Sequence, residues 1–236
     1  MAPLPEDWDR ALAVVAHPDD LEFGASSAVA RWTAAGKEVA YLLATRGEAG
    51  IDSLAPQQCG AIRSTEQLAS ARAVGVEQVE FLGYPDGMLT YSLELRRDLA
   101  RAIRAHRPEV LVSINYRASF GPGTLNHADH RVVGEVLLDA MRDAANRWVF
   151  PELAAEGLEP WRGLRFAAFN GSPAADYFVD VTDYLDRGIA SLAEHRVYLE
   201  NLSGKFDLVN FLRSNAESAG SNAGVPLAVT FELVNL

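Results

Sequence analysis

The first half of the chain alternates short, mostly apolar runs with longer stretches that have a helical pattern. Such runs are typical of strands buried on both faces of a sheet. The predicted strands are residues 12–16, 39–44, 79–82 and 110–114. The predicted helices are residues 25–35, 61–74 and 91–106, and residues 51–58 are expected to form a loop. Strands separated by helices pair in parallel through right-handed crossovers, so we predict an α/β fold: a Rossmann-like, mostly parallel open sheet with helices on both faces.

The second half of the chain has a weaker pattern. The elements predicted there are a helix at residues 131–145, strands at 164–169 and 177–181, and a long helix at 183–202. Weak alternation at residues 227–234 is compatible with an edge strand or a contact between subunits. We expect residues 1–236 to form one α/β domain, in which residues 146–236 are compatible with a smaller C-terminal lobe.

The helix predicted at residues 91–106 has two distinct sides. Its apolar side consists of Leu93, Leu95, Leu99 and Ile103. Its basic side consists of Arg96, Arg97, Arg101 and Arg104. A row of like charges at helical spacing is typical of a solvated face, so we expect these arginines to face water.

A cluster of polar residues follows the first predicted strand. The sequence His17-Pro18-Asp19-Asp20 comes directly after the apolar residues 12–16. Ligands bind at the carboxyl ends of strands in open α/β sheets. Burying an imidazole with two carboxylates is costly unless a cation or hydrogen bonds compensate the charges. The cluster therefore indicates a metal site, and the alternative is a solvated turn in which Asp19 or Asp20 caps the next helix.

A second cluster, Asn126-His127-Ala128-Asp129-His130, precedes the helix predicted at residues 131–145. Counting back along that helix places His130 and His127 on the side of its apolar residues, at the end that faces the strand ends. Asp129 lies between them and is placed to orient an imidazole. The alternative is a helix start capped by Asn126, with partly exposed histidines.

Polar residues also follow the other predicted strands. Glu48, Asp86 and Asn115 each come shortly after one of them. Because parallel strands end at the same edge of a sheet, these side chains are expected to share one rim with the two clusters. A rim with so many functional groups indicates a catalytic or binding crevice.

Composition excludes several classes of protein. A net charge of −11 without a basic stripe argues against a nucleic-acid partner. The single cysteine, Cys59, cannot form an intrachain disulfide, so the fold does not depend on an oxidising compartment. The N-terminus carries acids where a signal peptide would have basic residues, and no apolar run approaches the roughly 18 residues of a membrane span. We expect a cytoplasmic protein with no membrane span, and self-association into a homo-oligomer is left open.

Histidine and aspartate ligands drawn from the two clusters leave an open coordination position, as catalytic zinc requires. Nitrogen and oxygen ligands without a thiolate suit Zn²⁺, with Fe²⁺, Mn²⁺ and Co²⁺ as alternatives. We expect one ion per chain. Such an ion lowers the pKa of bound water to about 7, and a neighbouring carboxylate can accept the proton as the water attacks a carbonyl. The predicted reaction is hydrolysis of an amide, with an ester as the alternative.

These motifs resemble the LmbE/PIG-L-like metal-dependent de-N-acetylases, a family that includes N-acetylglucosaminyl deacetylases and mycothiol S-conjugate amidase. The resemblance covers about residues 10–200 in motif order. It is specific at residues 16–20 and 127–130. It is supported at residues 45–48, 63–66, 82–87 and 179–182.

The resemblance implies a role for each site residue. His17, Asp20 and His130 would bind zinc. Asp19 would be the general base, and His127, oriented by Asp129, would stabilise the oxyanion or act as the acid. The resemblance also implies that Arg63 and Asp86 contact the substrate, and from their place on the rim we expect the same of Glu48 and Asn115.

Two positions depart from the family pattern. Leu125 stands where some members carry a tyrosine that assists at the carbonyl. The sequence His195-Arg196-Val197-Tyr198 stands where the family often has His-x-Ser-Gln. Both departures concern the substrate more than the reaction.

The expected function is that of a zinc-dependent amide hydrolase. It would remove an N-acyl group, in the first place N-acetyl, from an amino sugar or a glucosamine-containing conjugate. This small-molecule substrate follows from the resemblance alone. The alternative within the class is a mycothiol-conjugate amidase or a natural-product tailoring deacylase. The alternative of another class is a non-catalytic α/β module that binds a polar metabolite.

Overall fold

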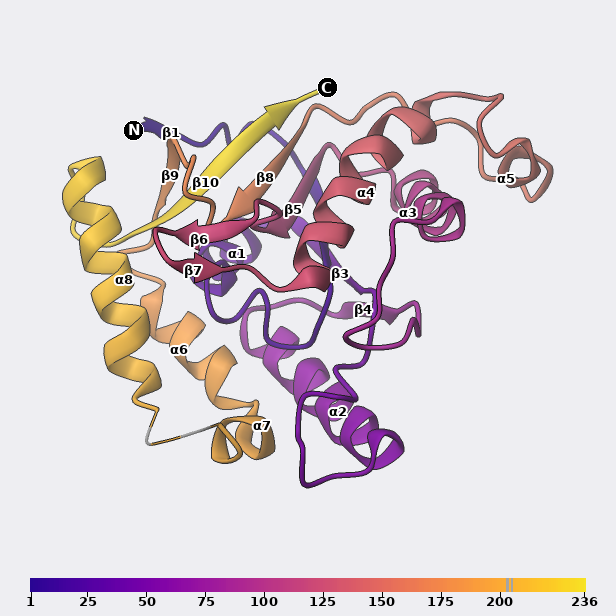
Figure 1. The fold of residues 1–236 in the computed structure, drawn as a ribbon. Coiled ribbons are helices and arrows are strands. Elements are labelled where there is room, and N and C mark those ends of the chain that lie inside the picture. Colours follow the sequence, from indigo (N-terminus) through magenta and orange to yellow (C-terminus); the bar gives the residue numbers. More distant parts are fainter. Residues whose placement is uncertain (203, 205) are drawn as a thin grey trace.

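The structure is a computed structural model that describes residues 1–202, 204 and 206–236. Its main feature is an eight-stranded sheet with the order β1-β9-β10-β8-β5-β2-β3-β4 (Figure 1). Its strands are β1 (Ala2–Pro3), β2 (Arg10–Val15), β3 (Glu38–Leu43), β4 (Gln78–Phe81), β5 (Val110–Ile114), β8 (Phe166–Asn170), β9 (Tyr177–Asp180) and β10 (Ala228–Asn235). A separate hairpin pairs β6 (Ser119–Gly121) with β7 (Thr124–Leu125).

Helices cover both faces of the sheet, as the alternation of strands and helices predicts (Figure 1). The helices are α1 (Ser26–Ala34), α2 (Pro56–Ala73), α3 (Leu93–His106), α4 (Ala128–Ala145), α5 (Pro151–Ala155), α6 (Leu185–Ala193), α7 (Arg196–Glu200) and α8 (Leu208–Ala223). Alternate side chains of the central strands point to opposite faces. One set packs on α1 and α2, with α6 outside them and α8 against α6, β9 and β10, and the other set packs on α3 and α4.

The predicted α/β class and the mostly parallel sheet are confirmed. The pairs β2/β3, β2/β5, β3/β4 and β5/β8 are all parallel. β2 has β3 on one side and β5 on the other, so the strand order reverses beside β2. A crevice forms outside the strand ends at such a reversal, and this places the residues that follow β2 and β5 at its mouth.

The C-terminal part of the chain differs from the sequence predictions. Of the two alternatives for residues 227–234, the edge strand is wrong, because β10 lies between β8 and β9 and runs antiparallel to both. The helix predicted at residues 183–202 is two helices, α6 and α7, separated around the buried His195. α8 was not predicted, and α2 begins at Pro56, inside the segment predicted as a loop.

The basic side predicted for α3 is only partly solvated. Arg104 is 2% exposed, whereas Leu93, predicted on the apolar side, is 67% exposed. The Arg104 guanidinium donates hydrogen bonds to the backbone carbonyls of Asp143, Ala144, Asn146, Val149 and Leu158. A guanidinium has five N–H donors, so these carbonyls compensate the burial of its charge. Arg104 therefore anchors the chain that leaves α4.

None of the described helices combines the length and the apolar character that a membrane crossing needs.

Candidate active site

The loop after β2 shapes the first part of the site. Asp19 has a φ angle of +87°, a conformation that is uncommon for residues other than glycine. Its carbonyl accepts hydrogen bonds from the backbone N–H groups of Glu22 and Phe23, which closes a turn. Gly24 follows, where a Cβ atom would lie 1.7 Å from Asn170 Oδ1, so only glycine fits against the end of β8. The helix α1 follows, with Ala25 in the N-cap position and no side-chain cap, so the alternative that Asp19 or Asp20 caps it is wrong.

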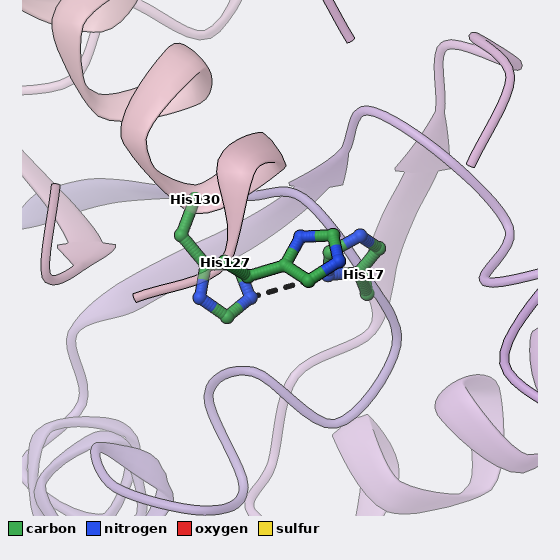
Figure 2. Close-up of side chains that lie close together, drawn as sticks. All are labelled: His17, His127 and His130. Atoms are coloured by element: carbon green, nitrogen blue, oxygen red, sulfur yellow. Dashed lines mark hydrogen bonds between the residues drawn. The ribbon is translucent and has the colours of Figure 1, made fainter. Parts of the chain in front are cut away.

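His17, Asp20 and His130 bring three ligand atoms together. The distance is 3.2 Å between His17 Nδ1 and His130 Nε2, 2.9 Å between His130 Nε2 and Asp20 Oδ1, and 3.6 Å between His17 Nδ1 and Asp20 Oδ1. Two ligands of one tetrahedral Zn²⁺ lie about 3.4 Å apart, since each is about 2.1 Å from the ion. The triangle of donor atoms therefore fits a single ion. The three imidazoles of His17, His127 and His130 also converge, at the start of α4 (Figure 2).

Hydrogen bonds to the backbone fix two of these groups. Asp20 Oδ2 accepts from the N–H groups of Ala16 and His17, which leaves Oδ1 directed at the two imidazoles. His130 Nδ1 lies 2.9 Å from Asn126 Oδ1, so the other ring nitrogen is free to face Asp20. Asn126 does not cap α4, because its Nδ2 donates to the carbonyls after β5 and His127 is the capping residue. The end of β5 thus positions His130.

The far edge of the His17 ring meets two more carboxylates. His17 Nε2 lies 3.0 Å from Asp86 Oδ1 and 3.3 Å from Asp129 Oδ2. These three residues form a second group of atoms close enough to share an ion. The two nitrogens of the His17 ring can have different tasks: Nδ1 can be a metal ligand, while Nε2–H donates to a carboxylate and so fixes the tautomer. This division favours the His17, Asp20 and His130 atoms as the ligand set.

The charges of neighbouring side chains oppose the effect of burial on the pKa values of His17 and Asp20. Burial alone would lower the pKa of His17, but Asp20, Asp129 and Asp86 together raise that pKa well above its usual value. Burial alone would raise the pKa of Asp20, but His130 and His17 hold it well below its usual value. Asp20 is therefore ionised at neutral pH.

Asp19 has a different environment from its neighbour. Burial raises the pKa of Asp19 to about 7, with the Arg63 guanidinium opposing this shift. Arg63 Nη2 lies 3.2 Å from Asp19 Oδ2, and the Asp19 N–H donates to Gln67 Oε1 at 3.0 Å. A carboxylate with a pKa near neutrality can both accept and release a proton at physiological pH.

Arg63 is itself buried and held by backbone carbonyls. It donates to Pro18 O at 2.6 Å and to Gly47 O at 3.0 Å. Cβ atoms at Gly47 and Gly50 would lie 2.2 Å and 2.3 Å from its Nη1 atom, so these glycines make room for the guanidinium. Arg63 also lines the cavity beside the site.

His127 and Asp129 contact each other through the backbone. The Asp129 N–H donates to His127 Nδ1 at 3.2 Å. The Asp129 carboxylate turns away from that ring, toward His17 and the N–H groups of Gly87 and Leu89. Burial and the neighbouring histidines lower the pKa of His127, so its imidazole is neutral at pH 7.

Glu48 and Asn115 are not among the residues that line the cavity. Glu48 accepts hydrogen bonds from the N–H groups of Arg46 and Asp86, and it joins two loops of the rim. Asn115 is buried and binds the backbone of residues 117 and 119. Asp86 does line the cavity, and its other oxygen accepts from the Ala49 N–H.

Sequence reasoning did not single out Gln67, Phe120 or Phe211 as functional residues. Gln67 lies one helical turn after Arg63, and this i, i+4 spacing is a signal that could have indicated it. Phe120 and Phe211 line a cavity of about 670 Å³ that also contains His17, Asp19 and His130. No pattern pointed to Phe211, because α8 itself was not predicted.

Comparisons with known proteins agree with this geometry. Residues 12–141 match the family described as PIG-L: GlcNAc-PI de-N-acetylase. The chain is 27% identical over 195 residues to the diacetylchitobiose deacetylase of Thermococcus kodakarensis, covering 80% of this chain and 70% of the relative. It is 31% identical over 181 residues to the 1D-myo-inositol 2-acetamido-2-deoxy-alpha-D-glucopyranoside deacetylase of Thermobispora bispora, covering 65% of this chain and 56% of the relative.

A solved structure of a deacetylase is also similar to this chain. The N,N'-diacetylchitobiose deacetylase from Pyrococcus horikoshii superposes with a TM-score of 0.85 and 27% identity, covering 97% of this chain and 85% of that one. The resemblance to the LmbE/PIG-L-like proteins is thereby confirmed. Because the family match spans more than half of its residues, the chain belongs to the GlcNAc-PI de-N-acetylase (PIG-L) family of amide hydrolases.

Proposed function

We propose that this protein hydrolyses the N-acyl amide of an acylated amino sugar or a related conjugate, with N-acetyl as the first candidate group, and that it uses one Zn²⁺ per chain. The observation that carries the proposal is the triangle of His17, Asp20 and His130 donor atoms, 2.9–3.6 Å apart, with Asp19 adjacent in sequence. The activities of the relatives, deacetylation of diacetylchitobiose and of an acetylated glucosaminyl inositol, support the substrate class.

In this proposal His17, Asp20 and His130 hold the ion. A bound divalent ion supplies Lewis acidity, which activates a water nucleophile and polarises the acyl carbonyl. Asp19 then accepts a proton at its carboxylate. Arg63 lies against one Asp19 oxygen, and Gln67 holds the Asp19 backbone, so the carboxylate has a fixed position before the substrate arrives.

His127 supplies a donor for the charge that develops on the acyl oxygen. Its Nδ1 accepts the Asp129 N–H, so the neutral ring carries its proton on Nε2. An N–H group directed at a developing oxyanion stabilises the transition state, and the proton that Asp19 accepts can pass to the leaving amine. His127 lines the cavity, within reach of a substrate there.

Two substitutions test these assignments. Asp19→Asn should retain about one ion per chain and lose roughly 10²–10⁴-fold in turnover, because it removes the base and keeps the ligands. His130→Ala should lose both metal and turnover. Metal content after dialysis and the rate of amine release are measured for each, with the exposed Asp186→Asn as the control. Wild-type turnover in Asp19→Asn would refute the base, and undiminished metal in His130→Ala would refute the ligand set.

A substrate panel tests the reaction class. Amine release is measured with N-acetylglucosamine, N,N'-diacetylchitobiose, an N-acetylglucosaminyl inositol and a mycothiol conjugate. Release from the first three supports the deacetylase, whereas release from the conjugate alone supports the amidase. Binding without release of any amine, by protein that contains its metal, would contradict the proposed function in favour of a binding module.

A further inference from the structure

The cavity beside the candidate active site extends well beyond the ligand atoms. Its volume of about 670 Å³ is in the range of sites that enclose drug-sized ligands. His17, Asp19, Asp20 and His130 line one part of it. The rest includes a set of apolar side chains that no step of the proposed reaction uses. We call this set the apolar compartment, and it consists of Phe23, Ile114, Phe120 and Phe211.

Phe23 and Phe211 form one wall of the apolar compartment, and Phe206, which does not line the cavity, packs against both. The ring centroids of Phe23 and Phe211 are 5.9 Å apart, and Phe206 lies 5.7 Å from Phe23 and 5.4 Å from Phe211. These distances are typical of rings that pack against one another. Phe23 belongs to the turn that carries Asp19 and Asp20, so the wall is continuous with the catalytic loop. Phe206 and Phe23 also pack on the small core under α8, which holds the wall in place.

Phe120 contributes to the compartment from the β6–β7 hairpin. Its ring centroid lies 6.3 Å from that of His130, so this apolar surface begins next to the proposed ligands. Phe120 is 38% exposed and Phe211 is 37% exposed. Exposed aromatic surface that borders a pocket is typical of a ligand-binding groove.

Polar groups are few in this part of the cavity. Asn215, one turn after Phe211 on α8, also lines the cavity, as do Thr124 and Asn170, but the phenylalanine side chains offer no hydrogen bonds to hydroxyl groups. A sugar that enters such a surface leaves its hydroxyl groups without partners, which costs binding free energy. An apolar substituent binds there favourably, and its affinity increases about fourfold for each methylene group removed from water.

We propose that the apolar compartment binds an apolar substituent of the substrate, carried on the amino sugar as a glycosidic aglycone or as an N-acyl chain longer than acetyl. This inference rests on the proposed function, because the amide must reach Asp19 while the substituent lies against Phe120 and Phe211. The substrate is therefore an amphipathic acylated amino sugar.

The test compares substrates that differ only in the apolar group. Methyl and octyl β-glycosides of N-acetylglucosamine test the aglycone, and N-acetyl- and N-octanoylglucosamine test the acyl chain. We expect kcat/KM to be at least tenfold higher for the octyl or the octanoyl member of one pair, and the pair that responds identifies the source of the apolar group. Equal values within both pairs, in an enzyme that deacetylates the methyl glycoside, would overturn the proposal.

Variants locate the effect. Phe211→Ala should reduce the preference for the longer substrate at least fivefold, and Phe211→Leu should retain part of it. Val209→Ala is the matched control, since Val209 is an exposed apolar residue on α8 and does not line the cavity. Phe120→Ala, on the hairpin outside the main cores, gives a second reading if Phe211→Ala does not fold. An unchanged preference in both alanine variants would overturn the assignment. Failure of every substrate, including N-acetylglucosamine and diacetylchitobiose, would instead count against the proposed function.

Discussion

Gln67 joins the backbone of Asp19 to a buried carboxylate, and its replacement should slow turnover more than it weakens binding. Gln67 Oε1 accepts the Asp19 N–H at 3.0 Å, and Gln67 Nε2 donates to Glu22 Oε1 at 2.9 Å. Ser70 donates to the same Glu22 oxygen at 2.8 Å but is not bonded to Asp19. The three side chains are buried. Gln67→Met and Ser70→Ala therefore both remove a hydrogen bond to Glu22, and only Gln67→Met also releases Asp19.

The structure gives the expected magnitudes. Each variant leaves Glu22 with one partner fewer, which should cost about 1–3 kcal/mol of the free energy of unfolding. Gln67→Met also frees a backbone with a φ angle of +87°, a conformation that stores about 1–3 kcal/mol of strain and persists only while its surroundings hold it. A carboxylate displaced by about 1 Å costs up to roughly 10²-fold in rate. We expect kcat to fall about 10- to 100-fold in Gln67→Met and less than about threefold in Ser70→Ala.

The assay is steady-state kinetics of amine release, with urea unfolding and metal content measured on the same preparations. KM should change little in both variants, because neither residue lines the cavity. If the two variants lose stability and kcat to the same extent, Gln67 supports only the fold and the positioning argument is refuted. A loss of kcat in Gln67→Met that is matched by a loss of metal would also refute it, since the defect would then lie in the ligand set.

Three further predictions concern metal, pH and core charge. Removing the ion with a chelator should lower the melting temperature by roughly 5–10 °C, because an ion at about 100 times its Kd stabilises the fold by about 2.7 kcal/mol. Adding Zn²⁺ should restore the melting temperature. An unchanged melting temperature would argue against a bound ion. Burial lowers the pKa of His195 to about 3, with Arg63 adding to the shift, and Glu22 Oε2 is 3.8 Å away, beyond hydrogen-bond distance. Below pH 6.5 the unfolded state therefore binds more protons at His195 than the folded state does. The free energy of unfolding in urea should fall by about 2 kcal/mol between pH 7 and 5 because of His195, and His195→Leu should not show this fall. Arg104→Met should lower the free energy of unfolding in urea by at least about 3 kcal/mol. Arg101→Met should lower it by less than about 1 kcal/mol, because Glu156, the partner of Arg101, is exposed. Equal losses in the two variants would contradict the anchoring role of Arg104.

The parallel part of the sheet could be predicted because its signals are local. Each of β2, β3 and β5 is a short apolar run, and polar residues follow directly where the strand ends. The rule that parallel strands end at one edge then brings His17 near the residues that follow β5, although about a hundred residues separate them. No comparable rule applies to β10, because its antiparallel place between β8 and β9 is set by contacts between distant segments. The break between α6 and α7 at His195 could not be predicted either, because no glycine or proline lies next to it in the sequence.

The distinction between Asp19 and Asp20 shows what the sequence alone leaves undecided. The two carboxylates are adjacent and chemically identical, so composition and spacing give no reason to assign them different tasks. The positive φ of Asp19 turns the chain between them, and their side chains then enter different surroundings. Asp20 meets two imidazoles and two backbone N–H groups, and its pKa falls well below the usual value, whereas burial raises the pKa of Asp19 to about 7. Neighbouring carboxyl groups whose pKa values move apart are suited to different roles, here an anionic ligand and a proton acceptor. A single backbone angle, in a turn that is hydrogen-bonded to the Gln67 side chain and to the N–H groups of Glu22 and Phe23, therefore separates the two proposed functions.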